Sequence, residues 1–195
     1  MPVSVAIPGV LFCFSAAVLL TFVSVSTPTW DKIYFLDAGS GSAITFFGVF
    51  GSTGTHPSVG YRFNLASSSA SSLSTPVIMN LTKTLILHPI AAGMSGLASI
   101  FGLCGMGMSY NGGTVVMVLL AALATVSCLM AFLFDMVLFG IARNNFRGQG
   151  IPSQYGNACW LTLAALVTLL LGFSTTACGV FARYKKRNNQ HSRSF

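Results

Sequence analysis

Four long apolar runs, separated by polar and turn-rich segments, dominate the pattern of the chain. They cover about residues 4–27, 84–108, 114–142 and 157–182. Each is close to or above the roughly 20 residues that a helix needs to cross a bilayer. The pattern predicts an all-α transmembrane four-helix bundle in a single integral membrane domain, residues 1–195. The first run has no preceding Lys or Arg and exceeds the roughly 7–15 apolar residues of a signal peptide, so we expect a retained span rather than a cleaved signal.

The loop between the first two runs, about 28–83, is the only one large enough to fold. Short β-branched and aromatic runs, "KIYF", "AITFFGVF" and "VGYRF", alternate there with Gly, Ser and Pro, which is typical of strands and turns. They predict a small antiparallel β-sheet of three strands in this first, extracellular loop. The short "SYNGG" turn between the second and third runs makes those two helices antiparallel neighbours.

The composition agrees with a membrane protein and gives little support to catalysis. The chain is 53% hydrophobic and 7% charged, whereas soluble domains carry roughly 25% charged residues. Its acids are Asp31, Asp37 and Asp135, with no Glu. The sequence contains no metal-ligand cluster, nucleophilic triad or phosphate-binding loop. We therefore expect a protein that is not an enzyme and has no cofactor or metal.

The basic tail, residues 183–195, bears on orientation and on lipids. Positive charges divide evenly between the two sides and do not decide the orientation, but four of them directly follow the last span, which favours cytoplasmic termini. The sequon at Asn80 then lies outside and is a candidate glycosylation site. The tail is either an ordinary anchor or a site for anionic lipids, while nucleic-acid binding is implausible. Its basic residues are Arg183, Lys185, Lys186, Arg187 and Arg193.

Small residues at about four-residue spacing predict where the helices pack. Lipid provides no hydrophobic drive between helices, so close backbone approach and hydrogen bonds hold a bundle together. We expect packing within the bundle rather than dimerisation. The residues in the second span are Ala91, Ser95, Gly96 and Ser99, and those in the fourth are Ala164, Thr168, Gly172 and Thr176.

Asp135 stands among apolar residues of the third span, and the second span contains His88. They lie about seven and about five residues inside their spans, so at roughly 1.5 Å per residue their depths differ by only a few ångströms. Ser24, Asn157 and Trp160 are other candidate partners of Asp135. The first interpretation is a polar clamp, contributing about 0.6–2 kcal/mol. The alternative is a coupled pair that senses external pH, since histidine titrates near neutrality.

Several segments resemble the fungal PalI/Sur-type family of four-span plasma-membrane proteins. They are "LILHPIAAGMSGLASIFGL", "FDMVLFGIAR", "YGNACWLTLAALVTLLLGF" and "FFGVFG". The family includes an ambient-pH response regulator and eisosome-associated members. The layout also resembles the claudin-type fold, with Trp30 and Gly48 in a weak form of its loop signature. Related proteins commonly carry a cysteine pair in the first loop, whereas all five cysteines here fall within the spans.

The resemblance implies a plasma-membrane scaffold or accessory subunit that associates laterally with larger membrane complexes and with anionic lipids or sterol. Microdomain organisation and support of a signalling or transport complex, including ambient-pH response, both remain open. Self-association into a homo-oligomer is a further option. The rival hypothesis is a small channel or transporter that uses Asp135 and His88. The expected contact surface of the loop comprises Trp30, Phe46, Phe47, Gly48 and Phe50.

Overall fold

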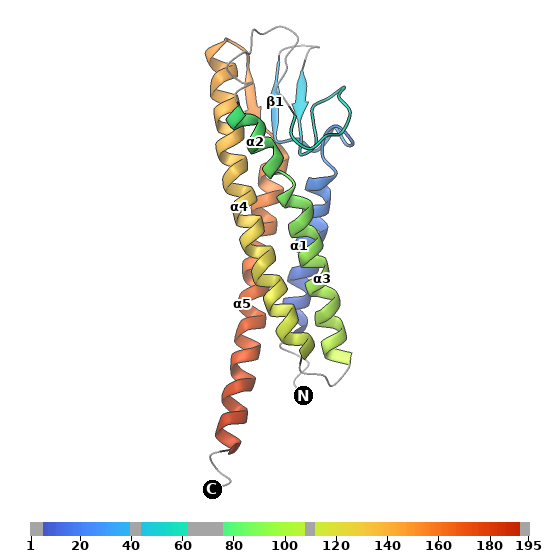
Figure 1. Ribbon diagram of the computed structural model, residues 1–195, viewed down its shortest axis with the longest axis vertical. Coiled ribbons are helices and arrows are strands. Elements are labelled where there is room, and N and C mark those ends of the chain that lie inside the picture. Colours follow the sequence, from blue (N-terminus) through green and yellow to red (C-terminus); the bar gives the residue numbers. More distant parts are fainter. Residues whose placement is uncertain (1–5, 40–43, 62–75, 108–111, 192–195) are drawn as a thin grey trace.

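The computed structural model describes residues 6–39, 44–61, 76–107 and 112–191. Within them, α1 (Ala6–Ser24), α3 (Leu87–Gly107), α4 (Gly112–Gly148) and α5 (Asn157–His191) form a bundle. A small sheet and the short helix α2 (Pro76–Thr84) cap one end, and the start of α1 and the end of α5 lie toward the other (Figure 1). Four helices in the described part are long and apolar enough to cross a membrane. The predicted four-helix transmembrane fold is confirmed.

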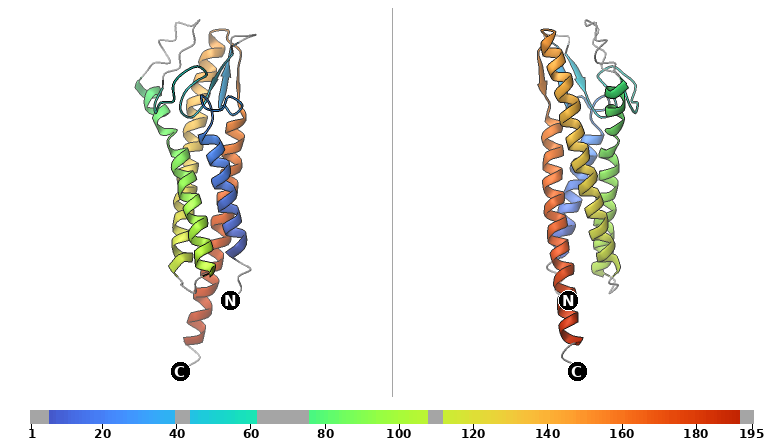
Figure 2. Two further views of the ribbon diagram at one scale, coloured as in Figure 1. Left: turned by 90° about the vertical axis from the view of Figure 1, so that its right-hand side faces the viewer. Right: turned by 60° about the vertical axis from the view of Figure 1, so that its left-hand side comes forward.

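Two helices run further than the apolar runs suggest. α4 continues to Gly148, past the expected end near residue 142, because Leu138, Phe139, Ala142 and Phe146 form one helical face that is fully buried beneath the sheet. α5 continues to His191, so most of the predicted tail is helical and extends beyond the rest of the bundle (Figure 2). Polar residues at the ends of both runs concealed these extensions.

The sheet contains β1 (Leu36–Ala38), β2 (Thr45–Phe47) and β3 (Ser153–Tyr155) in the order β2-β1-β3, with both pairings antiparallel. Leu36 is paired with Phe47 on one side and with Tyr155 on the other. A three-stranded antiparallel sheet is as predicted, but β1 follows "KIYF" instead of containing it, and the third strand comes from the loop between α4 and α5. The expected strand "VGYRF" is not one: residues 59–61 form no strand, and Arg62 and Phe63 lie outside the described residues.

Polar contacts explain why β3 is recruited to the sheet. Ser153 donates a hydrogen bond to the carbonyl of Arg143, and Arg147 Nε donates to the carbonyl of Ser153. The backbone N–H of Gln154 donates to Asp37 Oδ1 at 2.7 Å. The top of α4 thus positions a strand whose sequence, "SQY", has no hydrophobic alternation that would predict it.

Aromatic rings join the sheet to the bundle. Phe35, which directly precedes β1, stacks on Phe139 of α4 with ring centroids 5.0 Å apart, and Phe47 stacks on Phe146 at 6.0 Å. All four rings are fully buried. The sheet is therefore part of the same hydrophobic core as the helix ends beneath it.

Candidate functional site

Pro89 prepares the position of His88. A continuous helix would have residue 89 donate its backbone N–H to the carbonyl of Leu85, but proline has no N–H. The chain instead turns between α2 and α3, and the carbonyl of Leu85 accepts from the backbone N–H of His88 at 3.1 Å. The ring Nδ1 of His88 lies 3.0 Å from the same oxygen. A carbonyl can only accept, so Nδ1 carries a hydrogen and donates it.

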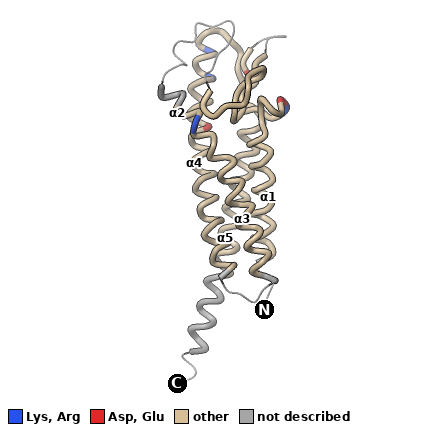
Figure 3. The backbone as a smooth tube through the Cα atoms, turned by 45° about the vertical axis from the view of Figure 1, so that its right-hand side comes forward, with Lys and Arg blue, Asp and Glu red and all other residues tan. Residues whose placement is uncertain are grey.

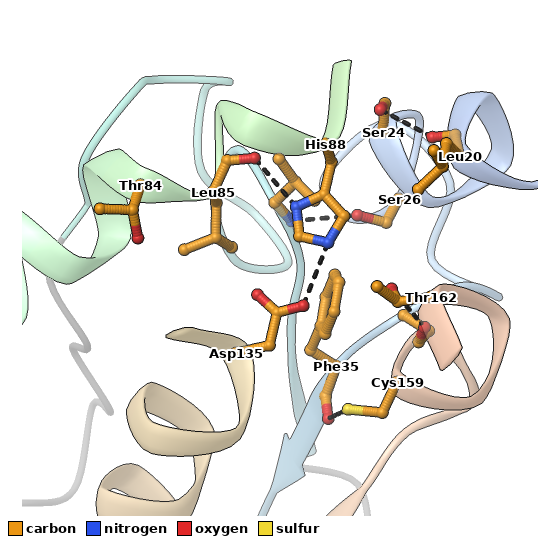
Figure 4. A network of polar contacts seen from close by, with 12 residues as sticks. Leu20, Ser24, Ser26, Phe35, Thr84, Leu85, His88, Asp135, Cys159 and Thr162 are labelled. Atoms are coloured by element: carbon orange, nitrogen blue, oxygen red, sulfur yellow. Dashed lines mark hydrogen bonds and ion pairs between the residues drawn. The ribbon is translucent and has the colours of Figure 1, made fainter. Parts of the chain in front are cut away.

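The other ring nitrogen faces α4. His88 Nε2 lies 3.0 Å from Asp135 Oδ2, with the side chains 0% and 1% exposed (Figure 4). Because Nδ1 is already a donor, the Nε2–Oδ2 contact holds one proton, either as imidazolium and carboxylate or as neutral imidazole and carboxylic acid. Both forms have zero net charge. Adding or removing a proton would leave a net charge in a buried site, which is costly.

The pair is buried, and an aromatic ring lies against it. The edge of the Phe35 ring faces the His88 ring at a centroid distance of 5.5 Å. Asp135 Oδ1 has no hydrogen-bond partner among the described residues, and the Nε2–Oδ2 contact is a close ion-pair contact rather than a well-directed hydrogen bond. The pair joins α3 and α4 directly beneath the sheet, so it lies at the junction of the helical and β-sheet parts.

Tyr61 adds a buried polar contact above the pair. Its hydroxyl donates to the carbonyl of Gly48 at 2.7 Å, and its own carbonyl accepts from the Thr82 hydroxyl at 3.2 Å. Burial raises the pKa of Tyr61 well above its ordinary value, and the nearby Asp135 raises it further. Tyr61 therefore ties the first loop to α2 as a neutral phenol.

Other residues considered as partners of Asp135 have different roles. The Ser24 hydroxyl donates to the carbonyl of Leu20. Asn157 binds the backbone of Tyr34 and Lys32, which fixes the start of α5 against the loop. Trp160 is 70% exposed. Of the four candidates, His88 is the one that the structure places against Asp135.

The residues predicted to pack between helices are buried more completely on α3 than on α5. Ala91, Ser95 and Ser99 are buried and Gly96 is half-buried. On α5, Gly172 and Thr176 are buried, but Thr168 is half-buried and Ala164 is exposed, which corrects the predicted face. A strict four-residue step drifts around a helix of 3.6 residues per turn. The buried face of α5 alternates steps of four and three: Ala158, Thr162, Ala165, Leu169, Gly172 and Thr176.

The predicted contact surface of the first loop is only partly exposed. Trp30 is 44% exposed, and Phe46 and Phe50 are half-buried. Phe47 is wrong as a surface residue because it lies in the core against Phe146. Gly48 is also buried, where an added Cβ would collide with the backbone of Thr27.

Exposed aromatic residues form a band that the sequence did not lead us to predict. Trp30, Tyr155 and Trp160 are exposed where the helices meet the sheet. The described side chains that carry charge also gather at this end, while the rest of the described bundle has none (Figure 3). Trp and Tyr prefer the boundary between lipid and water. The positions of Trp30 after the first span and Trp160 at the start of the last could have indicated it.

Asn80 is exposed on α2, while Thr82 of its sequon is buried. Arg183, Lys185, Lys186 and Arg187 belong to α5, where the structure does not describe side chains, and Arg193 lies outside the described residues. The five cysteines are free. No group of three His, Cys, Asp or Glu within the described ranges could hold a metal ion.

Four bilayer-length helices capped by a small sheet define a multi-pass membrane protein. The sequence model of the SUR7/PalI family matches residues 5–183, and the chain belongs to this family. The resemblance noted from the sequence is thereby confirmed. A comparison with curated proteins gives no match.

Proposed function

We propose that the chain is a non-enzymatic plasma-membrane scaffold or accessory subunit that associates laterally with other membrane proteins and lipids. The burial of Asp135 is the observation that supports this proposal. A channel or transporter places its ionisable residues along a solvated pathway, whereas Asp135 is 1% exposed and its partner His88 is 0% exposed. A bundle with such a packed interior offers its outer surface for function.

The outer surface of the helix bundle is suited to lateral association in the membrane. Large apolar side chains are exposed along the spans of all four long helices, where lipid or another membrane protein can cover them. In the proposed orientation the termini are cytoplasmic and the sheet is extracellular. The basic end of α5 then lies near the cytoplasmic leaflet, where anionic lipids attract each charge by about 1 kcal/mol.

The same burial favours the clamp over the pH sensor. A sensor requires proton exchange with the outside at ordinary pH, but both side chains are buried beside Tyr61, which is itself buried, and a change in the net charge of the pair is costly. If the family's ambient-pH role extends to this chain, we place the titrating group in a partner protein. The pair then holds the helices in register whatever the external pH.

Flux measurements on the full chain in proteoliposomes test the proposal against conduction. We expect ion and small-solute flux equal to that of empty vesicles between pH 5 and 8. The matched variant is Asp135→Asn, which keeps the size of the side chain and removes its charge. Flux above the empty-vesicle level that Asp135→Asn abolishes would overturn the scaffold proposal in favour of a transport pathway.

A further inference from the structure

A groove with a volume of about 410 Å³ runs between α1 and α3 on the outer surface of the bundle. Some residues that line the groove are exposed and others are buried. The exposed side chains of Phe14, Phe22, Ile100 and Leu103 form its rims, and the buried Ala17 lies at its floor. Gly96 keeps the floor open, because a Cβ added there would meet nothing within 4 Å. The groove therefore combines bulky walls with a shallow, small-residue floor.

The groove has almost no free polar group with which an occupant could form a hydrogen bond. Two hydroxyls line it, and both are engaged within their own helices. Thr21 donates to the carbonyl of Ala17 at 2.7 Å, and Ser99 donates to the carbonyl of Ser95 at 2.9 Å. An apolar molecular body fits these walls, whereas a headgroup or a polar peptide would be left without partners.

The position of the groove indicates that its occupant comes from the lipid bilayer. Both of its helices are candidate membrane spans, so the groove opens toward lipid. At the sheet end, Phe22 contacts Trp30 with ring centroids 6.0 Å apart. Since Trp30 belongs to the aromatic band at the lipid–water boundary, a molecule in the groove can keep one polar end at that boundary.

We infer that this groove binds the rigid ring system of a membrane sterol, with the hydroxyl directed toward Trp30. Binding in a fixed groove costs a flexible acyl chain its conformational freedom, and a rigid body loses far less. A partner helix would need close backbone approach through small residues, which the bulky rims prevent. The inference rests on the proposed function only in that both require the bundle to lie in a bilayer.

Photolabelling of the full chain in vesicles with a diazirine-bearing cholesterol analogue tests this inference. We expect labelled peptides from residues 14–22 and 96–103, and competition by unlabelled cholesterol. Gly96→Leu should fill the floor and reduce that labelling roughly tenfold, as expected when most of the contact is lost. Gly93→Leu is the matched control, because Gly93 also has open space but does not line the groove.

A second variant covers the case in which Gly96→Leu fails to fold. Phe14→Ala removes an exposed rim side chain, which the core does not need, and should also weaken the labelling. Labelling spread evenly over the outer faces of all four spans, or unchanged in both variants, would overturn the inference. Neither result would alter the expected absence of flux, so the two proposals fail separately.

Discussion

Asp135 meets a single hydrogen-bonding nitrogen, and this predicts which substitutions it tolerates. His88 Nδ1 donates to Leu85, so Nε2 can accept a hydrogen bond from a neutral neighbour. Asparagine at position 135 can donate one, and we expect Asp135→Asn to fold with nearly unchanged stability. Asp135→Leu should cost about 1–3 kcal/mol, because it leaves Nε2 buried without a partner.

Unfolding of both Asp135 variants in mixed detergent micelles measures the difference. The double variant His88→Leu/Asp135→Leu is the control, since it removes both polar groups and should recover part of the loss. Equal stability of Asp135→Leu and the parent protein would show that the clamp contributes nothing.

The raised pKa of Tyr61 predicts that the folded protein loses stability at alkaline pH. Its pKa is raised in the folded state, so above pH of about 10 the unfolded chain binds fewer protons at this residue than the folded one. Its contribution is fully present below that pH and declines as the pH rises further. Stability measured from pH 9 to 11 should fall less in Tyr61→Phe than in the parent protein. Identical slopes would contradict a buried, neutral Tyr61.

The contact between His88 and Asp135 was predictable from the residues, but much of its environment was not. The depth of His88 and Asp135 followed from helix rise, and the short turn between their spans made them neighbours. The engagement of Nδ1 by Leu85 depends on the break at Pro89, which an uninterrupted apolar run conceals. Phe47 looked like a surface residue because a loop with little hydrophobic periodicity gives no face to assign.

Close contact between α1 and α5 makes Gly172 sensitive to size. A Cβ at Gly172 would lie 3.2 Å from Cys13 Sγ and from Phe12 Cβ. We expect Gly172→Leu to destabilise the bundle by about 1–3 kcal/mol through overpacking. Ala164→Leu on the same helix should be nearly neutral, because Ala164 is exposed. Thermal unfolding in detergent distinguishes the two, and an equal loss would contradict the observed face of α5.

Strands were harder to predict than helices. The long apolar runs predicted the presence of each helix and approximately where it begins and ends. A spanning segment must be helical because it has to satisfy all its backbone hydrogen-bonding groups internally. β3 has three residues, and its pairing in the sheet depends on Asp37, which lies 117 residues away in the sequence, in addition to the nearby Arg147. Such long-range polar contacts leave no periodicity in the sequence.

The whole molecule is longer than a bilayer is thick. α4 has 37 residues, or about 55 Å at 1.5 Å per residue, against a hydrocarbon core of about 30 Å. We expect the end of α4 beneath the sheet, where the described charged side chains gather, to stand outside the hydrocarbon. We expect the aromatic band at Trp30 and Trp160 to lie at the boundary.

Tryptophan fluorescence can locate that boundary, because Trp30 and Trp160 are the only two tryptophans. In vesicles, quenchers at the headgroup level should quench the emission more strongly than lipids brominated near the bilayer centre. The single-tryptophan variants Trp30→Phe and Trp160→Phe should behave alike. Stronger quenching from the centre in either variant would contradict this placement of the bundle.

Purification from the native membrane tests the proposed lateral association most directly. The full chain, isolated in a mild detergent, should elute as a discrete complex larger than itself and contain other integral membrane proteins. Mass spectrometry identifies them, and a harsher detergent provides the dissociated control. Recovery of the chain alone, as a monomer of 20.5 kDa under the mild conditions, would contradict the account.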